Sequence, residues 1–127
     1  MENGQLITNT DSGKVVQEKS FSFAVRVVNL YKHLTIEHNE YILSKQLLRS
    51  GTAVGALIRE AEQAESKADF IHKLAISLKE ANESTYWLDL LHETRYLERK
   101  AYDSIKADNV ELLKLLTSII KSAKANK

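Results

Sequence analysis

The chain contains no proline, so no residue among its 127 forces a break in a helix once the helix has started. Its apolar residues recur every three or four positions over long segments, which is the period of an amphipathic helix. Four glycines are too few for the turns of a strand-rich fold. The absence of cysteine excludes disulfides, a thiol nucleophile and thiolate metal sites. Together these features predict an all-α protein.

The length predicts one domain, which we place at residues 15–127 after a flexible tail at residues 1–14. The tail segment is polar, contains two glycines and shows no apolar period. No apolar run approaches the roughly 18 residues of a membrane span, and the N-terminus lacks the apolar core of a signal peptide. We therefore expect a soluble, cytoplasmic protein.

The first helix is expected at roughly residues 16–37, and it carries two neighbouring apolar stripes. One stripe starts at Phe21 and the other starts at Phe23. The beginning of this segment also alternates like a β-strand, but the helical period continues for several further turns and decides the assignment. His38 and Asn39 then form a plausible turn.

Three further helices complete an up-down-up-down four-helix bundle with short connections. The second is expected at roughly residues 40–64 and the third at roughly residues 67–94. Ser66 and Asp69 have the spacing of a capping box at the start of the third helix.

The final helix follows a connector at about residues 95–99 and has a seam close to that of a coiled coil. Asp108 and Glu111 resemble a second capping box, which leaves open a break of this helix near Asp108. The apolar residues expected to face the core are Ile105, Leu112, Leu116, Ile119 and Ala123.

Two features of the second and third helices predict close packing and self-association. Gly51 and Gly55 lie one turn apart within a helix, where each costs about 1 kcal/mol relative to alanine, and close helix approach explains them better than a ligand contact. The third helix is apolar on two sides, so it needs a second partner, most economically another copy of the chain. The candidate oligomer interface comprises Gly51, Gly55, Ile76, Glu83, Trp87, Leu90 and Leu91.

Acid–histidine pairs at helical spacing occur twice, as Asp69 with His72 and Asp89 with His92. Both pairs lie on the same helix about 30 Å apart, so they cannot form the shared di-metal site that some bundles contain. We expect His92 to be a hydrogen-bonded core histidine. No metal and no cofactor is predicted.

Nothing in the sequence supports catalysis more strongly than a structural role. Serines are plentiful, but no nucleophile lies in a recognisable turn beside a base. Glu80 and Glu83 are the acids of most interest, and an ion pair with Arg49, Arg59 or a neighbouring protomer is favoured over acid–base chemistry. We therefore predict a protein that is not an enzyme.

The near-neutral net charge of +1 conceals a basic–acidic–basic order along the chain. Residues 14–59 hold seven Lys or Arg against three acids, residues 60–93 hold three against eight, and residues 94–127 hold eight against four. A solvated surface is the simpler interpretation, and binding of a polyanion is the alternative. The candidate nucleic-acid contacts are Lys45, Arg49, Arg59, Lys114, Lys121 and Lys124. No aromatic residue is interleaved with them in the sequence, so we expect contacts to the nucleic-acid backbone and little base recognition.

Two long motifs, SKQLLRSGTAVGALIREA at residues 44–61 and SKADFIHKLAISLKEANESTYWLDLL at residues 66–91, carry a family resemblance. They are similar to the bacterial four-helix-bundle proteins encoded in intervening sequences of 23S ribosomal RNA genes. Upstream and downstream segments fit the same pattern, and the resemblance covers roughly residues 15–122.

The resemblance implies a bundle that assembles as a homo-oligomeric ring, typically a homopentamer, with no known catalytic activity. Distantly related accessory proteins of diversity-generating retroelements share the architecture, bind nucleic acid and work with a reverse transcriptase. We therefore expect a self-associating accessory protein that binds RNA or DNA weakly and without sequence preference. The alternative is a protein–protein scaffold, for example beside a reverse transcriptase, without direct nucleic-acid binding.

Overall fold

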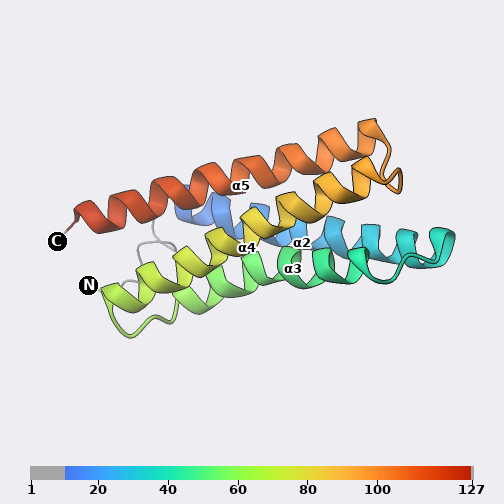
Figure 1. Ribbon diagram of the computed structural model, residues 1–127. Helices are drawn as coiled ribbons and strands as arrows, with labels where there is room; N and C mark the ends of the chain where they lie inside the picture. Colours follow the sequence, from blue (N-terminus) through green and yellow to red (C-terminus); the bar gives the residue numbers. More distant parts are fainter. Residues whose placement is uncertain (1–10, 127) are drawn as a thin grey trace.

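The computed structural model describes residues 11–126, and it is built from four α-helices (Figure 1). They are α2 (Asp11–His38), α3 (Leu43–Ala61), α4 (Lys67–Glu93) and α5 (Arg99–Ala125). Each helix packs against the next along the chain, and α5 returns to pack against α2, so that α3 and α5 lie on opposite corners. The predicted all-α up-down arrangement is confirmed. Within the described residues, none of the helices is long and apolar enough to cross a membrane.

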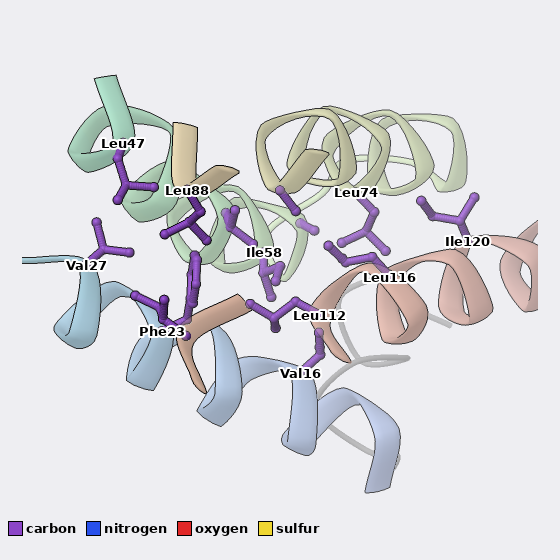
Figure 2. Packing of buried hydrophobic residues seen from close by; sticks show 14 of the residues in the cluster. Val16, Phe23, Val27, Leu47, Ile58, Leu74, Leu88, Leu112, Leu116 and Ile120 are labelled. Atoms are coloured by element: carbon purple, nitrogen blue, oxygen red, sulfur yellow. The ribbon is translucent and has the colours of Figure 1, made fainter. Parts of the chain in front are cut away.

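The hydrophobic core runs along the bundle axis and receives side chains from all four helices (Figure 2). On α2 the buried stripe is the one that starts at Phe23 and continues through Val27 and Leu34. The neighbouring stripe turns outward, since Phe21 and Val25 are largely exposed. Both stripes have the helical period, but only one can face the axis once α3 and α5 pack on either side.

Side-chain caps define the helix boundaries on both sides of α3. Ser66 accepts a 3.0 Å hydrogen bond from the Asp69 backbone N–H, as the capping pattern predicted for the start of α4. At the start of α3 the Glu40 carboxylate accepts hydrogen bonds from three successive backbone N–H groups, those of residues 42–44. Burial of Glu40 acts to raise its pKa, but these three donors outweigh that effect and lower the pKa. The expected turn is confirmed, since Asn39 adopts the left-handed conformation with φ 54°.

Helix α5 is continuous, so the possible break near Asp108 does not occur. Both acids of the apparent capping box point instead to α2, where Asp108 pairs with Arg26 at 2.6 Å and Glu111 pairs with Lys19 at 3.1 Å. The core residue near the end of this helix is Ile120, while Ile119 is only half-buried.

Helix α2 begins at Asp11, four residues before the predicted start of the domain. The rest of the expected tail, residues 1–10, lies outside the described residues.

The two glycines of α3 differ in what surrounds them. A Cβ atom added at Gly51 would lie 2.8 Å from Cγ2 of Val27, so the absence of a side chain lets α2 and α3 approach closely. A Cβ added at Gly55 would make ordinary contact at 3.4 Å with the Ser20 carbonyl oxygen. Close helix approach therefore accounts for Gly51, as predicted, but packing does not require a glycine at position 55.

Candidate nucleic-acid interface

The C-terminal half of α5 presents exposed lysines with no competing acid. Lys114, Lys121 and Lys124 are exposed, and every residue after Glu111 is neutral or basic. Glu111, the last acid, is itself paired with Lys19. Among the side chains that the structure describes, those of residues 13–126, no carboxylate lies within 4.0 Å of these three ammonium groups. This lysine face is therefore free to bind an anion.

Arg49 is occupied by an intramolecular network and does not belong to a free basic surface. Its guanidinium donates to Glu80 at 3.2 Å and also pairs with Glu83 on α4. Glu83 in turn accepts a 2.9 Å hydrogen bond from the indole N–H of Trp87. The Trp87 and Arg49 hydrogen bonds lower the pKa of Glu83, and the hydrogen bond to Glu83 raises the pKa of Arg49. The ion-pair interpretation of the two glutamates is confirmed.

The six predicted nucleic-acid contacts do not form one patch on a protomer. Lys45, Arg49 and Arg59 belong to α3 and the three lysines to α5, on opposite corners of the bundle. The start of α3, which carries Lys45, also lies at the end of the bundle that holds the α2–α3 connection, whereas the end of α5, which carries Lys121, lies at the opposite end (Figure 1). Any joint use of both sets on one protomer would require a ligand that wraps around the molecule.

Arg59 has a partner that the sequence did not indicate. Its guanidinium lies 5.8 Å from the centre of the Phe21 ring on α2, the geometry of a cation–π contact. No carboxylate in the described part of the chain pairs with Arg59. No aromatic residue is interleaved with the basic residues in the sequence, but the fold brings Phe21 from α2 beside Arg59 on α3.

Several residues predicted at an oligomer interface are used within the protomer instead. Leu91 is fully buried in the core, and Gly51 is buried against Val27. Glu83 and Trp87 belong to the network around Arg49, while Ile76 and Leu90 are half-buried and Gly55 borders a groove. The large apolar side chains that are exposed lie mostly on α2 and the connection after it: Phe21, Val25, Ile36, Tyr41, Ile42 and, on α4, Tyr86.

Asp89 and His92, one of the two acid–histidine pairs, take part in hydrogen bonds within the fold. Nδ1 of His92 lies 2.9 Å from the Leu97 carbonyl oxygen, so the predicted hydrogen-bonded histidine is confirmed, and its ring stacks on Tyr102. Asp89 accepts hydrogen bonds from the Tyr102 hydroxyl at 2.5 Å and from Lys106 at 2.9 Å. Burial acts to raise the pKa of Asp89, but these hydrogen bonds outweigh it and lower the pKa. No group of three or more potential metal ligands occurs in the described chain.

Comparison with known proteins identifies the family of the chain. The model of the 23S rRNA-intervening sequence protein family matches residues 14–118. The chain belongs to this family. A crystal structure of a protein of unknown function from the S23 ribosomal protein family of Bacteroides thetaiotaomicron VPI-5482 is 62% identical, with a TM-score of 0.84. The match covers 85% of this chain and 96% of that one. Among curated proteins, none matches the chain.

The segment matched by the family model contains some of the candidate nucleic-acid contacts and not others. It includes all of α3, with Arg59, and it includes Lys114 on α5. Lys121 and Lys124 lie beyond residue 118, outside the matched segment. The family match therefore includes only the first of the three α5 lysines.

Proposed function

We propose that this protein is a non-enzymatic accessory protein that binds RNA or DNA weakly and without sequence preference through the lysine face of α5. The observation that carries the proposal is that Lys114, Lys121 and Lys124 are exposed, while no carboxylate among the described side chains of residues 13–126 pairs with them. Lysines without acidic partners attract phosphates and release counterions on binding, which supplies sequence-independent affinity. Phosphate contacts position a protein on nucleic acid without reading bases.

Self-association strengthens the proposal, because three lysines on one protomer give little affinity. We propose that copies of the chain assemble into a ring, with five copies as the number implied by the family resemblance. The exposed apolar side chains of α2 and the following connection, including Val25, Ile36 and Ile42, support an interaction surface there. Repetition of the lysine face around a ring would let several weak sites engage one long polyanion.

The assembly is tested by light scattering at micromolar concentration. The expected mass is a multiple of 14.4 kDa, with a fivefold multiple corresponding to the proposed ring. A monomer at every concentration would remove the avidity on which the proposal depends.

Nucleic-acid binding is tested with a variant in which Lys114, Lys121 and Lys124 are all changed to glutamine. We expect weaker binding of mixed-sequence RNA and DNA at about 50 mM salt, and a shallower slope of log affinity against log salt by about 0.7–0.9 for each phosphate that is no longer neutralised. The matched control changes Lys32, Lys79 and Lys100 to glutamine, which alters the net charge equally on exposed residues elsewhere. Equal weakening in both variants would show a diffuse charge effect and reject the α5 face.

A protein–protein scaffold is the second candidate function. The observation that favours it is the exposure of Phe21, Ile36 and Ile42. Burial of these apolar side chains against a partner protein would be favourable in water. Such a scaffold would bind a protein partner, for example a reverse transcriptase, with little dependence on salt. If the wild-type protein binds no nucleic acid at about 50 mM salt, this second function replaces the first.

A further inference from the structure

A groove of about 450 Å³ runs between α2 and α3, on the side of the molecule away from the lysine face of α5. This volume is within the range of pockets that hold small organic groups. Phe21, which lines the groove, is 60% exposed, and the Arg59 guanidinium lies over its ring, 5.8 Å from the ring centre. An exposed aromatic face beside an arginine without an acidic partner in the described chain is the basic unit of a base-stacking platform.

The polar groups of the groove add a donor without a partner. The amide nitrogen of Gln17, which lines the groove, is buried and lacks a hydrogen-bond partner in the described part of the protein. A buried donor left unsatisfied costs about 1–3 kcal/mol. Because Gln17 as a whole is only half-buried, rotation of its side chain would let the amide donate to an acceptor that enters the groove. Thr52, on the opposite wall, donates its hydroxyl hydrogen to the Leu48 carbonyl at 2.7 Å and keeps an oxygen lone pair that can accept. The walls can therefore accept a hydrogen bond as well as donate one.

A separate observation, which does not depend on the aromatic and polar groups of the groove, comes from Gly55. It lies within α3, where glycine costs about 1 kcal/mol relative to alanine, and packing leaves ordinary contact distance for a Cβ atom. Gly51, one turn earlier, is required by the approach of Val27, but Gly55 has no such constraint. Gly55 borders the groove together with Ala56, so these small residues of α3 form the floor of the groove and leave its volume unfilled. A groove kept open at a cost to helix stability indicates an occupant that comes close to the backbone.

We propose that this groove holds one unpaired nucleobase of a single-stranded nucleic acid, a proposal that rests on the function proposed above. The base stacks on Phe21, an edge acceptor of the base takes the Gln17 amide donor, and Arg59 contacts the adjacent phosphate. A nucleobase fits the observations because it combines a flat π face with hydrogen-bonding edges and is attached to an anion. The protein therefore prefers single strands to duplexes, whose bases are already stacked and paired.

The test measures binding of a short single-stranded RNA containing 2-aminopurine, a base analogue whose fluorescence falls when it stacks on an aromatic ring. Wild-type protein should quench the fluorescence and bind the single strand more tightly than a duplex of equal length. Phe21→Ala should weaken single-strand binding by about 5- to 100-fold, the range for one stacked base, and abolish the quenching. The salt slope should become shallower by no more than about 0.7–0.9, the contribution of the one phosphate at Arg59, because the contacts of the α5 lysines remain.

Two sets of variants control for changes that are not specific to stacking. Tyr86→Ala removes an aromatic side chain of nearly equal exposure, 59%, from α4, outside the groove, and should change neither affinity nor quenching. Phe21→Leu keeps an apolar side chain but removes the π face, so it should behave like Phe21→Ala. Ala56→Leu fills the groove from an exposed position and should also reduce quenching, whereas Ala68→Leu, at an exposed position of α4, should not.

Three outcomes overturn the proposal, and they are distinguishable. Binding that depends on the α5 lysines but not on Phe21 leaves the proposed function intact and rejects the groove. A change of mass by light scattering in Phe21→Ala, with unchanged affinity per protomer, assigns the groove to contact between copies. Absence of any nucleic-acid binding by the wild type rejects the proposed function and this inference together.

Discussion

Helices α3 and α5 occupy opposite corners of the bundle and are held there by different means. Small residues, among them Ser44, Ser50 and Gly51, make up much of the buried face of α3. The buried face of α5 is made mainly of larger side chains such as Leu112 and Leu116. Around its edges α5 adds ion pairs to α2 and an ion pair from Lys106 to α4. Since α3 also carries partly exposed ion pairs to α4, through Arg49 and Glu60, the difference lies in the buried faces. Helix α3 depends on small side chains that let its neighbours approach closely, whereas α5 depends on the burial of larger apolar side chains.

The largest expected effect comes from adding volume to the buried face of α3. Ser50 is fully buried and its hydroxyl lies 2.9 Å from that of Ser84 on α4. Ser50→Leu should lower the free energy of unfolding by about 3 kcal/mol or more, because it overpacks the contact and strips Ser84 of a partner. The same change at exposed Ser118 on α5 should cost no more than about 0.5 kcal/mol. Equal losses in urea unfolding would show that the loss does not come from the packed contact of Ser50 with Ser84.

The two glycines of α3 sharpen the comparison, since the same substitution should have opposite signs. Gly51→Ala places a Cβ 2.8 Å from the stiff side chain of Val27, and we expect a loss of about 1–2 kcal/mol despite the better helix propensity. Gly55→Ala meets only ordinary contacts and should gain up to about 1 kcal/mol. Thermal unfolding of the two variants beside the wild type measures both signs. A loss of stability in both variants would mean that the residues around Gly55, at the floor of the groove, also leave no room for a Cβ atom.

The contrast also explains how far the sequence could predict the structure. Helix positions followed from local period, and the start of α4 followed from Ser66 and Asp69, whose hydrogen bond is local in the chain. The apparent cap at Asp108 misled because that carboxylate pairs with Arg26, 82 residues away. A local pattern cannot report a partner that only the tertiary fold supplies.

The candidate site was harder to predict than the fold for the same reason. Arg49 is neutralised by acids 31 and 34 positions away, and the sequence indicated Arg49 only as one of three possible partners of these acids. Arg59 and Phe21 come together only because α2 and α3 pack side by side. The exposure of Phe21 could not be deduced from the sequence, because the apolar stripe that starts at Phe21 has the same helical period as the buried stripe that starts at Phe23. The lysines of α5 were predictable because an exposed charge without acidic neighbours needs no tertiary partner.

The polar contacts of α5 predict a dependence on pH. Asp89 has a lowered pKa, so its contribution to stability is present above its ordinary value of 3.8 and is lost as pH falls through the lower value of the folded protein. The hydrogen bond to Tyr102 and that to Asp89 raise the pKa of Lys106 above 10.5, so its contribution is lost only as pH rises beyond that value. Asp89→Asn should cost about 0.5–1 kcal/mol at pH 7, discounted because both groups are partly exposed.

The contribution of Asp89 is measured by the free energy of unfolding at acid pH. Between pH 7 and the acid region the wild type should lose stability more steeply than Asp89→Asn, so the two curves converge at low pH. Parallel curves would show that the carboxylate has the same pKa in the folded and unfolded states. Ser50→Leu, which removes no charge, should instead run parallel to the wild type at every pH.

The smallest effect is expected for the ion pair that joins α5 to α2, and salt isolates it. Arg26 and Asp108 form a 2.6 Å contact, but more than a third of each side chain is exposed, so water and ions screen the attraction. Asp108→Asn should therefore cost only about 0.3–0.5 kcal/mol at low salt, and the deficit should vanish near 1 M NaCl, where the Debye length falls to about 3 Å. Glu18→Gln is the matched control, because Glu18 is exposed on α2 and pairs with no base in the described chain. A deficit that persists in high salt would mean that the hydrogen-bond geometry of Arg26, which also donates to Ser104 at 3.0 Å, matters more than its charge. In that case a directional hydrogen bond, and not a charge attraction that salt screens, would join α5 to α2.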